Sequence, residues 1–184
     1  MARLLDEALL AQLEAAWQAQ GAEIGTVLAA GLSDEAMTAL VEPLGLTLPE
    51  EARRWWGWHD GVTVTTPFGW DIGADVGFYS LAQAIEQYHE ERSAANEGQW
   101  PDAWLPLTYF RNGPLVIACS AEDVAVVHRV NWGVGVFPGG DSMGEVVALW
   151  IEMIETGAWS WNHEGYWDLD RSRAPERAQG MHVV

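Results

Sequence analysis

The chain has 184 residues, of which 49% are hydrophobic and 20% charged, so it can form a hydrophobic core unaided and is not disordered throughout. Nine basic residues, all of them arginine, stand against 27 acidic ones, and the formal net charge is −18. A field of this sign repels phosphate backbones and anionic lipid, which argues against direct binding of nucleic acid or membrane and favours a basic partner.

The sequence also indicates the compartment. Its single cysteine, Cys119, cannot form an internal disulfide, which suits a reducing environment. Asp6, Glu7 and Glu14 interrupt the leucine-rich start before a signal-peptide hydrophobic region can form. No apolar run approaches the roughly 20 residues that a membrane span needs. We therefore expect a cytoplasmic protein.

Apolar periodicity predicts three helices in the first third of the chain. Leucines recur at steps of four in the first helix, Ser33 is the N-cap of the second, and Pro49 begins the third. The expected ranges are 3–20, 34–42 and 49–59. Because Trp55 and Trp56 are adjacent on the third helix, we expect only one of them to point into the core.

Beyond Gly61 the pattern alternates, which predicts a strand over 62–66 and then a loop or loose hairpin over 68–77. Ser80 and Gln83 form a capping box at the start of a further helix. One face of that helix is acidic and is expected to meet water. Its acidic residues are Glu86, Glu90 and Glu91.

The second half of the chain predicts strands and one more helix. The expected strands are 105–110, 115–119, 124–130 and a short one at 134–137. Ser142 and Glu145 form a second capping box, and the helix that follows ends at Gly157. A tryptophan-rich tail turns charged after Asp168, and we expect residues 170–184 to be mobile. The fold class is therefore α+β, with helices packed against a mostly antiparallel sheet.

Three local motifs, in this order, carry a family resemblance. The first is a Leu-Pro start, an aromatic helix and an Asp-Gly end over 48–61. The second is Phe78-Tyr79-Ser80-Leu81, and the third is Trp104-Leu-Pro-Leu107 leading into two strands. Together they resemble the SUKH superfamily of fungal cell-wall synthesis regulators and bacterial toxin-immunity proteins. The resemblance covers a SUKH-like core at about 35–157. The chain length favours one domain over 1–184, in which a helical extension at 1–32 and a tail at 158–184 lie outside the resemblance.

The resemblance implies a protein-binding scaffold rather than an enzyme. Bacterial members typically neutralise a polymorphic toxin, often a nuclease, and a nuclease needs a cationic surface for its substrate. A strongly acidic inhibitor can cover that surface, and electrostatic steering speeds the encounter. The leading hypothesis is thus an immunity protein that binds a basic, nuclease-like toxin. Alternatives are a regulatory scaffold without a toxin partner and, least favoured, a small metal-dependent hydrolase.

Two expected loops, 68–77 and 131–141, carry the candidate partner-binding residues. Tryptophan is frequent among residues that dominate binding energy, and nearby aspartates supply an acidic rim. The candidates are Trp70, Asp71, Asp75, Trp132 and Asp141.

Catalytic and metal-binding interpretations are weaker. Asp60, Asp71 and Asp75 near His59 could form a metal cluster, but aspartates beside glycines are common turn formers. Cys119 and His128 could form a nucleophile and base, but both lie within apolar strand patterns, which favours a packed thiol. We expect no catalytic residue, no metal and no cofactor.

Overall fold

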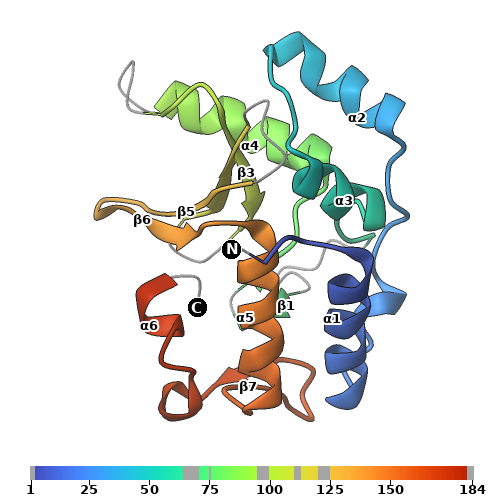
Figure 1. Ribbon diagram of the computed structural model, residues 1–184, viewed down its shortest axis with the longest axis vertical. Coiled ribbons are helices and arrows are strands. Elements are labelled where there is room, and N and C mark those ends of the chain that lie inside the picture. The colour runs from blue at the N-terminus through green and yellow to red at the C-terminus, as the bar shows by residue number, and fades with distance from the viewer. Residues whose placement is uncertain are drawn as a thin grey trace.

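The computed structural model describes residues 3–63, 71–74, 76–94, 100–109, 113–119 and 125–181 (Figure 1). Helices pack against a four-stranded antiparallel sheet, so the expected α+β class is confirmed. The α-helices are α1 (Glu7–Ala19), α2 (Asp34–Val41), α3 (Glu50–Trp58), α4 (Leu81–Ala94), α5 (Met143–Glu155) and α6 (Ala178–Met181). Short 3-10 helices are η1 (Ile24–Thr26), η2 (Glu42–Leu44) and η3 (Arg171–Arg173). The strands are β1 (Asp71–Gly73), β2 (Val76–Gly77), β3 (Trp104–Thr108), β4 (Leu115–Ala118), β5 (Val127–Asn131), β6 (Gly135–Gly140), β7 (Trp159–Trp161) and β8 (Trp167–Leu169).

The central sheet has the strand order β3-β4-β5-β6, and every neighbouring pair is antiparallel. Strands β3 and β4 are almost fully buried, whereas β6 lies at the edge and is mostly exposed. The expected strand at 134–137 is longer than its pattern indicated, because the glycines and proline that follow still pair with β5. The β5–β6 hairpin therefore projects from the buried part of the sheet (Figure 1).

The region expected as a strand at 62–66 and a loop at 68–77 is only partly described. Val62 pairs with Leu28 in an isolated antiparallel bridge, and residues 64–70 and 75 lie outside the described residues. Strands β1 and β2 form a two-stranded antiparallel hairpin, as the loose-hairpin alternative predicted.

Helix α5 forms the centre of the core, and ten of its 13 residues are buried. Its cap is the one that the sequence predicted, because Ser142 Oγ accepts the Glu145 N–H at 3.1 Å. Helix α1 packs along α5 and contributes a buried stripe to the same core. That stripe consists of Leu9, Leu10, Leu13 and Trp17.

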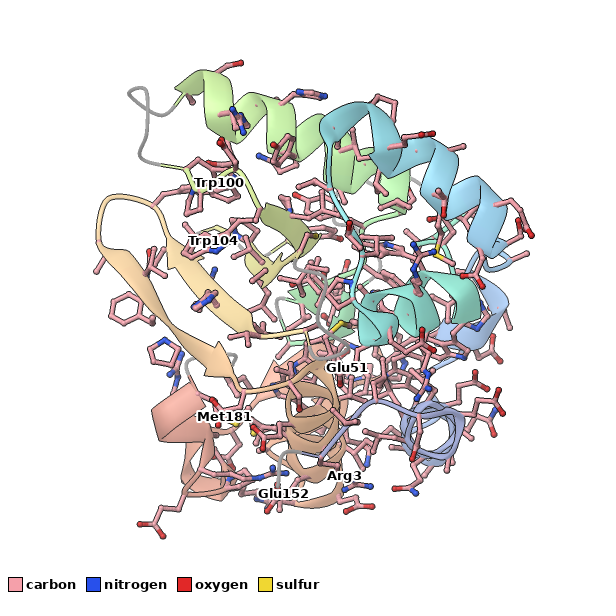
Figure 2. The ribbon with its side chains drawn as sticks, turned by 45° about the horizontal axis from the view of Figure 1, so that its top comes forward. Arg3, Glu51, Trp100, Trp104, Glu152 and Met181 are labelled. Carbon is pink, nitrogen blue, oxygen red and sulfur yellow. The ribbon has the colours of Figure 1, made fainter. Side chains whose placement is uncertain are left out.

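A buried carboxylate ties the start of the chain to this core. Glu51 on α3 is 2% exposed and accepts backbone N–H groups from Leu5 at 2.7 Å, Ala125 at 2.8 Å and Gly144 at 3.0 Å. Figure 2 shows Glu51 close to the start of α5. Gly144 is needed here, since a Cβ atom at this position would lie 2.2 Å from the Arg3 carbonyl oxygen. Segment 3–5 thus crosses the start of α5 at close range.

The Asp60–Gly61 motif joins α3 to α4. Asp60 Oδ1 accepts the Leu81 N–H at 2.7 Å, so this aspartate caps the next helix from a distance. The expected capping box is also present, with Gln83 N donating to Ser80 Oγ at 3.1 Å and Ser80 N donating to Gln83 Oε1 at 2.9 Å. Gly61 has φ +75°, and a Cβ there would lie 2.5 Å from Ser80 N. The Asp60–Gly61 motif and the Ser80–Gln83 capping box, which are separate in the sequence, are therefore in direct contact.

The adjacent tryptophans Trp55 and Trp56 are both fully buried, so the expectation that only one points into the core is wrong. Trp56 Nε1 donates to the Tyr79 carbonyl at 3.1 Å, which allows the second indole to be buried without losing its hydrogen bond. Trp55 packs on Phe78, with ring centroids 4.5 Å apart. Helix α3 is covered on two sides, and helical spacing alone does not reveal that.

The charged end of the chain, expected to be mobile over 170–184, is folded as far as Met181. Asp170 N donates to the Ala158 carbonyl at 2.8 Å, and Arg177 pairs with Glu152 on α5. Ala178 is 3% exposed. Figure 2 places Met181 beside the end of β6. Contacts with α5 and β6 hold this tail, and its local composition gives no sign of them.

Candidate protein-binding surface

Trp132 lies at the tip of the β5–β6 hairpin. The turn closes when Val134 N donates to the Asn131 carbonyl at 3.0 Å, and Gly133 supplies the left-handed conformation with φ +76°. The Trp132 side chain is 51% exposed. Its Nε1 nevertheless donates to Glu91 Oε1 on α4 at 3.0 Å. An exposed indole is thus oriented by a carboxylate from another element.

Apolar residues continue from Trp132 along the hairpin. Val134 is 69% exposed and Val136 is 51% exposed. Both lie within a stretch, from residue 130 to residue 140, that contains no charged residue. Isolated exposed apolar residues are ordinary, but three within five positions form a patch of the kind that marks an interaction site.

A series of contacting side chains connects Trp132 to residues on and before α4. Glu91 Oε1 also accepts a hydrogen bond from Gln87 Nε2 at 2.9 Å, and Tyr79 OH donates to Gln87 Oε1 at 3.3 Å. The Tyr79 and Tyr109 rings then pack with centroids 5.4 Å apart. All of these residues are exposed or half-buried.

The two phenols are held neutral. Burial, and after it the carboxylates of Glu91 and Glu90, together raise the pKa of Tyr79 to about 12. Burial also raises the pKa of Tyr109, with an added contribution from the Asp71 carboxylate, to which its hydroxyl is hydrogen-bonded. Near neutral pH these tyrosines therefore stay protonated hydrogen-bond donors among carboxylates.

These contacts define one surface, which we call the aromatic–acidic surface. Its members are Asp71, Tyr79, Gln87, Glu91, Tyr109 and Trp132. It brings together two of the residues chosen from the sequence, Asp71 and Trp132. Asp141 lies past the other end of β6 and is separated from Trp132 by the length of that strand, about 20 Å. Trp70 and Asp75 lie outside the described residues.

The sequence profile of the SMI1 / KNR4 family (SUKH-1) matches residues 31–156. The chain belongs to this family. The match confirms the expected SUKH resemblance. No curated protein matches the chain. Membership in the SMI1 / KNR4 family is consistent with an immunity or regulatory scaffold.

The matched range contains all six members of the aromatic–acidic surface. Trp132, Glu91 and the buried Glu51 all lie within residues 31–156. Helix α1, the β7–β8 hairpin and α6 lie outside that range, yet each packs on α5 or β6. In this member of the SMI1 / KNR4 family, the flanking segments therefore complete the core.

Several members of the surface were missed at the level of sequence. Glu91 was assigned to a solvated helix face, and Tyr79, Gln87 and Tyr109 were not singled out. One signal was available, because Gln87 and Glu91 are four apart and so share a helix face. The contact of Glu91 with a hairpin 41 positions later has no local signature.

The features that suggested catalysis have structural roles. Cys119 is buried, and burial raises its pKa to about 12, so the nucleophilic thiolate is strongly disfavoured. The His128 ring stacks on Trp104 at 4.7 Å, and burial lowers its pKa. Within the described ranges, no group of three or more His, Cys, Asp or Glu side chains is placed to hold a metal ion.

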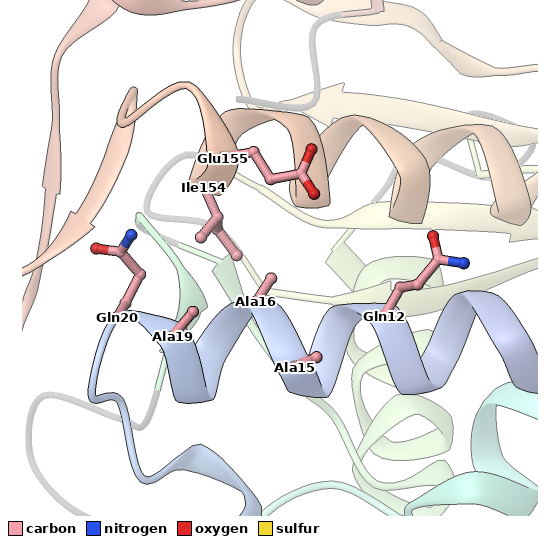
Figure 3. Close-up of a pocket in the computed structure, with 7 residues that line it drawn as sticks. All are labelled: Gln12, Ala15, Ala16, Ala19, Gln20, Ile154 and Glu155. Carbon is pink, nitrogen blue, oxygen red and sulfur yellow. The ribbon is translucent and has the colours of Figure 1, made fainter.

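The grooves beside α1 do not form a second site. One, of about 280 Å³, lies between α1 and α5 (Figure 3). It is lined by Gln12, Ala15, Ala16, Ala19, Gln20, Ile154 and Glu155. A larger groove of about 550 Å³ between α1 and α3 includes Glu14 and Trp58, but the Trp58 N–H is already bonded to Glu14 at 2.6 Å. In the described part of the chain, no helix is long and apolar enough to cross a membrane.

Proposed function

We propose that this protein is a non-enzymatic immunity protein that binds and neutralises a basic, nuclease-like toxin through the aromatic–acidic surface. The observation that carries the proposal is Trp132. It is half exposed at a hairpin tip, fixed by Glu91 and continued by two exposed valines. Oriented tryptophans with apolar neighbours are typical of residues that dominate binding energy.

The overall charge supports the same proposal. A net charge of −18 without a single lysine attracts a cationic partner over a distance of about one Debye length, roughly 8 Å at physiological salt. Such steering raises association rates well above those of neutral pairs. Rapid capture is the property that an inhibitor of a toxin needs.

The proposed binding surface keeps all the residues chosen from the sequence. Asp71 and Trp132 belong to the aromatic–acidic surface. In the sequence, Trp70 precedes β1 and Asp75 lies between β1 and β2, and both extend the proposal beyond the described residues. Asp141 would contact the partner separately, at the far end of β6.

A regulatory scaffold without a toxin partner is the second candidate, because the SMI1 / KNR4 family match accommodates it equally. Co-expression separates the two. The protein should restore growth of cells that express a toxic basic domain encoded beside its gene, and Trp132→Ala should weaken that protection. If neither the wild type nor Trp132→Ala protects the cells, and the protein captures signalling or cell-wall proteins, the regulatory scaffold would be favoured.

A further inference from the structure

The outer edge of β6 presents backbone groups on the side away from β5. Val130 N donates to the Pro114 carbonyl at 3.0 Å, so Val130 faces β4. Because residues of an antiparallel strand face its two neighbours alternately, Arg129 and Asn131 face β6, where their partners are Phe137 and Gly135. Val136, between those two, directs its N–H and C=O away from β5. No strand in the described ranges pairs with that edge.

This edge is only partly protected. Natural edge strands are commonly guarded by charged side chains, especially lysine, or by proline. Strand β6 has no charged residue, and its one proline, Pro138, leaves the stretch around Val136 open. Helix α6 covers only part of the strand, with Met181 beside Gly140. The open part contains the exposed side chains of Val134 and Val136.

Carboxylates stand at both ends of the open edge. Glu91 lies at the turn, held to Trp132, and Asp141 follows the last residue of β6 with Glu145 bonded to its backbone at 3.2 Å. Arg129, on the neighbouring strand β5, is engaged with the backbone carbonyls of Gly113, Pro114 and Val130. A chain lying along β6 would meet apolar side chains in the middle and negative charge at its ends.

We infer that β6 binds an extended, basic segment of the partner as an added fifth strand, with Val136 N–H and C=O forming main-chain hydrogen bonds. The inference rests on the proposed function and names how the partner is held. β-Strand addition combines main-chain bonds with alternating side-chain contacts. A second copy of this chain is a poor occupant, because each copy carries −18 and no lysine.

The first test uses a capped synthetic peptide, Arg-Val-Arg-Val-Arg-Val, added to the isotope-labelled full chain. The Val136 amide should become protected from hydrogen exchange and should shift in the NMR spectrum. A Glu-Val-Glu-Val-Glu-Val peptide and an N-methylated form of the basic peptide should leave it unprotected. Lack of protection at Val136 with millimolar basic peptide would overturn the inference.

The second test uses substitutions. Val136→Pro removes the outward N–H together with the valine side chain, whereas Val136→Ala shortens the side chain and keeps the N–H; prolines are tolerated at strand edges. We expect Val136→Pro to weaken peptide binding by about tenfold, the value of one lost hydrogen bond, while Val136→Ala weakens it by less. Equal effects of the two substitutions would show that side-chain contact alone matters and would contradict strand addition.

The same variants separate this inference from the proposed function. If Trp132→Ala weakens toxin binding and Val136→Pro does not, the surface is right and the added strand is wrong. If neither variant affects toxin binding, the proposed binding surface and the added strand are both wrong. If the free protein forms dimers and Val136→Pro dissociates them, a second copy of the chain occupies this edge, and the inference is wrong.

Discussion

The indole of Trp132 and the carboxylate of Glu91 are joined by a hydrogen bond of 3.0 Å across 41 positions of sequence. The bond fixes a side chain that is 51% exposed, and fixing it before binding lowers the entropy that a partner must remove. It also places a negative charge beside the aromatic ring. Trp132 is therefore suited to contact a basic protein.

Trp132→Ala should weaken binding of the toxin by about 30-fold or more, which corresponds to a loss of about 2 kcal/mol. Protein stability should change little because the side chain is half exposed. Calorimetric titration measures the affinity, and thermal unfolding checks the fold. Tyr166→Ala is the matched control, since Tyr166 is 50% exposed on the β7–β8 hairpin. Equal affinities of the two variants would rule out Trp132 as an anchor.

Glu51→Gln should lower the free energy of unfolding by about 2 kcal/mol. Glutamine has one carbonyl oxygen, so its NH2 group would face one of the three backbone N–H groups that Glu51 now accepts. Urea denaturation measures the loss. Glu50→Gln is the control at the next position, where the exposed pair with Arg54 should contribute no more than about 0.5 kcal/mol. Similar losses for both variants would refute the role of Glu51 as a buried clamp.

Asp60→Asn tests the cap at α4. Burial raises the pKa of Asp60, and the Leu81 N–H bond only partly offsets this. The native state therefore holds the Asp60 proton more tightly than the unfolded state, and this group contributes less stability as pH rises. Asparagine keeps an acceptor for Leu81 but carries no charge.

Asp60→Asn should accordingly be at least as stable as the wild type at neutral pH, and any advantage should vanish below the unfolded pKa, near pH 3.9. Asp60→Ala removes the acceptor and should cost about 1 kcal/mol at neutral pH. Unfolding curves measured from pH 3 to pH 8 compare all three proteins. An Asp60→Asn variant as unstable as Asp60→Ala would contradict this account of the cap.

The pKa of the Tyr79 phenol is sensitive to the surrounding carboxylates. Its pKa is raised to about 12, chiefly by burial and then by Glu91 and Glu90. Glu91→Gln should lower that value in an ultraviolet titration, with Tyr79→Phe used to assign the signal. Because the folded pKa exceeds the unfolded one, this group should reduce protein stability as pH rises from 10 to 12. An unchanged titration in Glu91→Gln would place the carboxylate too far away to matter.

Local signals in the sequence predicted most of the helices and strands. The caps at Ser33, Ser80 and Ser142 were identifiable because each involves residues only three positions apart. The long-range contacts were not identifiable in this way. Glu51 looked like a first-turn glutamate at a helix start, and only tertiary packing makes it a buried acceptor for three distant amides.

The candidate surface was predicted in part for the same reason. Trp132 was chosen because its neighbours indicated a turn, and turns expose their residues. Its partner Glu91 was assigned to solvent, since a charged helix face gives no sign of a hairpin packed beside it. Trp55 and Trp56 show the opposite error, because burial on two sides of a helix depends on elements remote in sequence.

The most direct test of the central claim is the salt dependence of association with a basic toxin domain encoded beside the gene, measured by stopped-flow fluorescence. A steered acidic surface predicts an association rate that falls by about tenfold or more between 50 mM and 500 mM salt, with a nearly constant dissociation rate. Trp132→Ala should raise the dissociation rate and leave the salt slope unchanged. An association rate independent of salt, with dissociation unaffected by Trp132→Ala, would contradict the account.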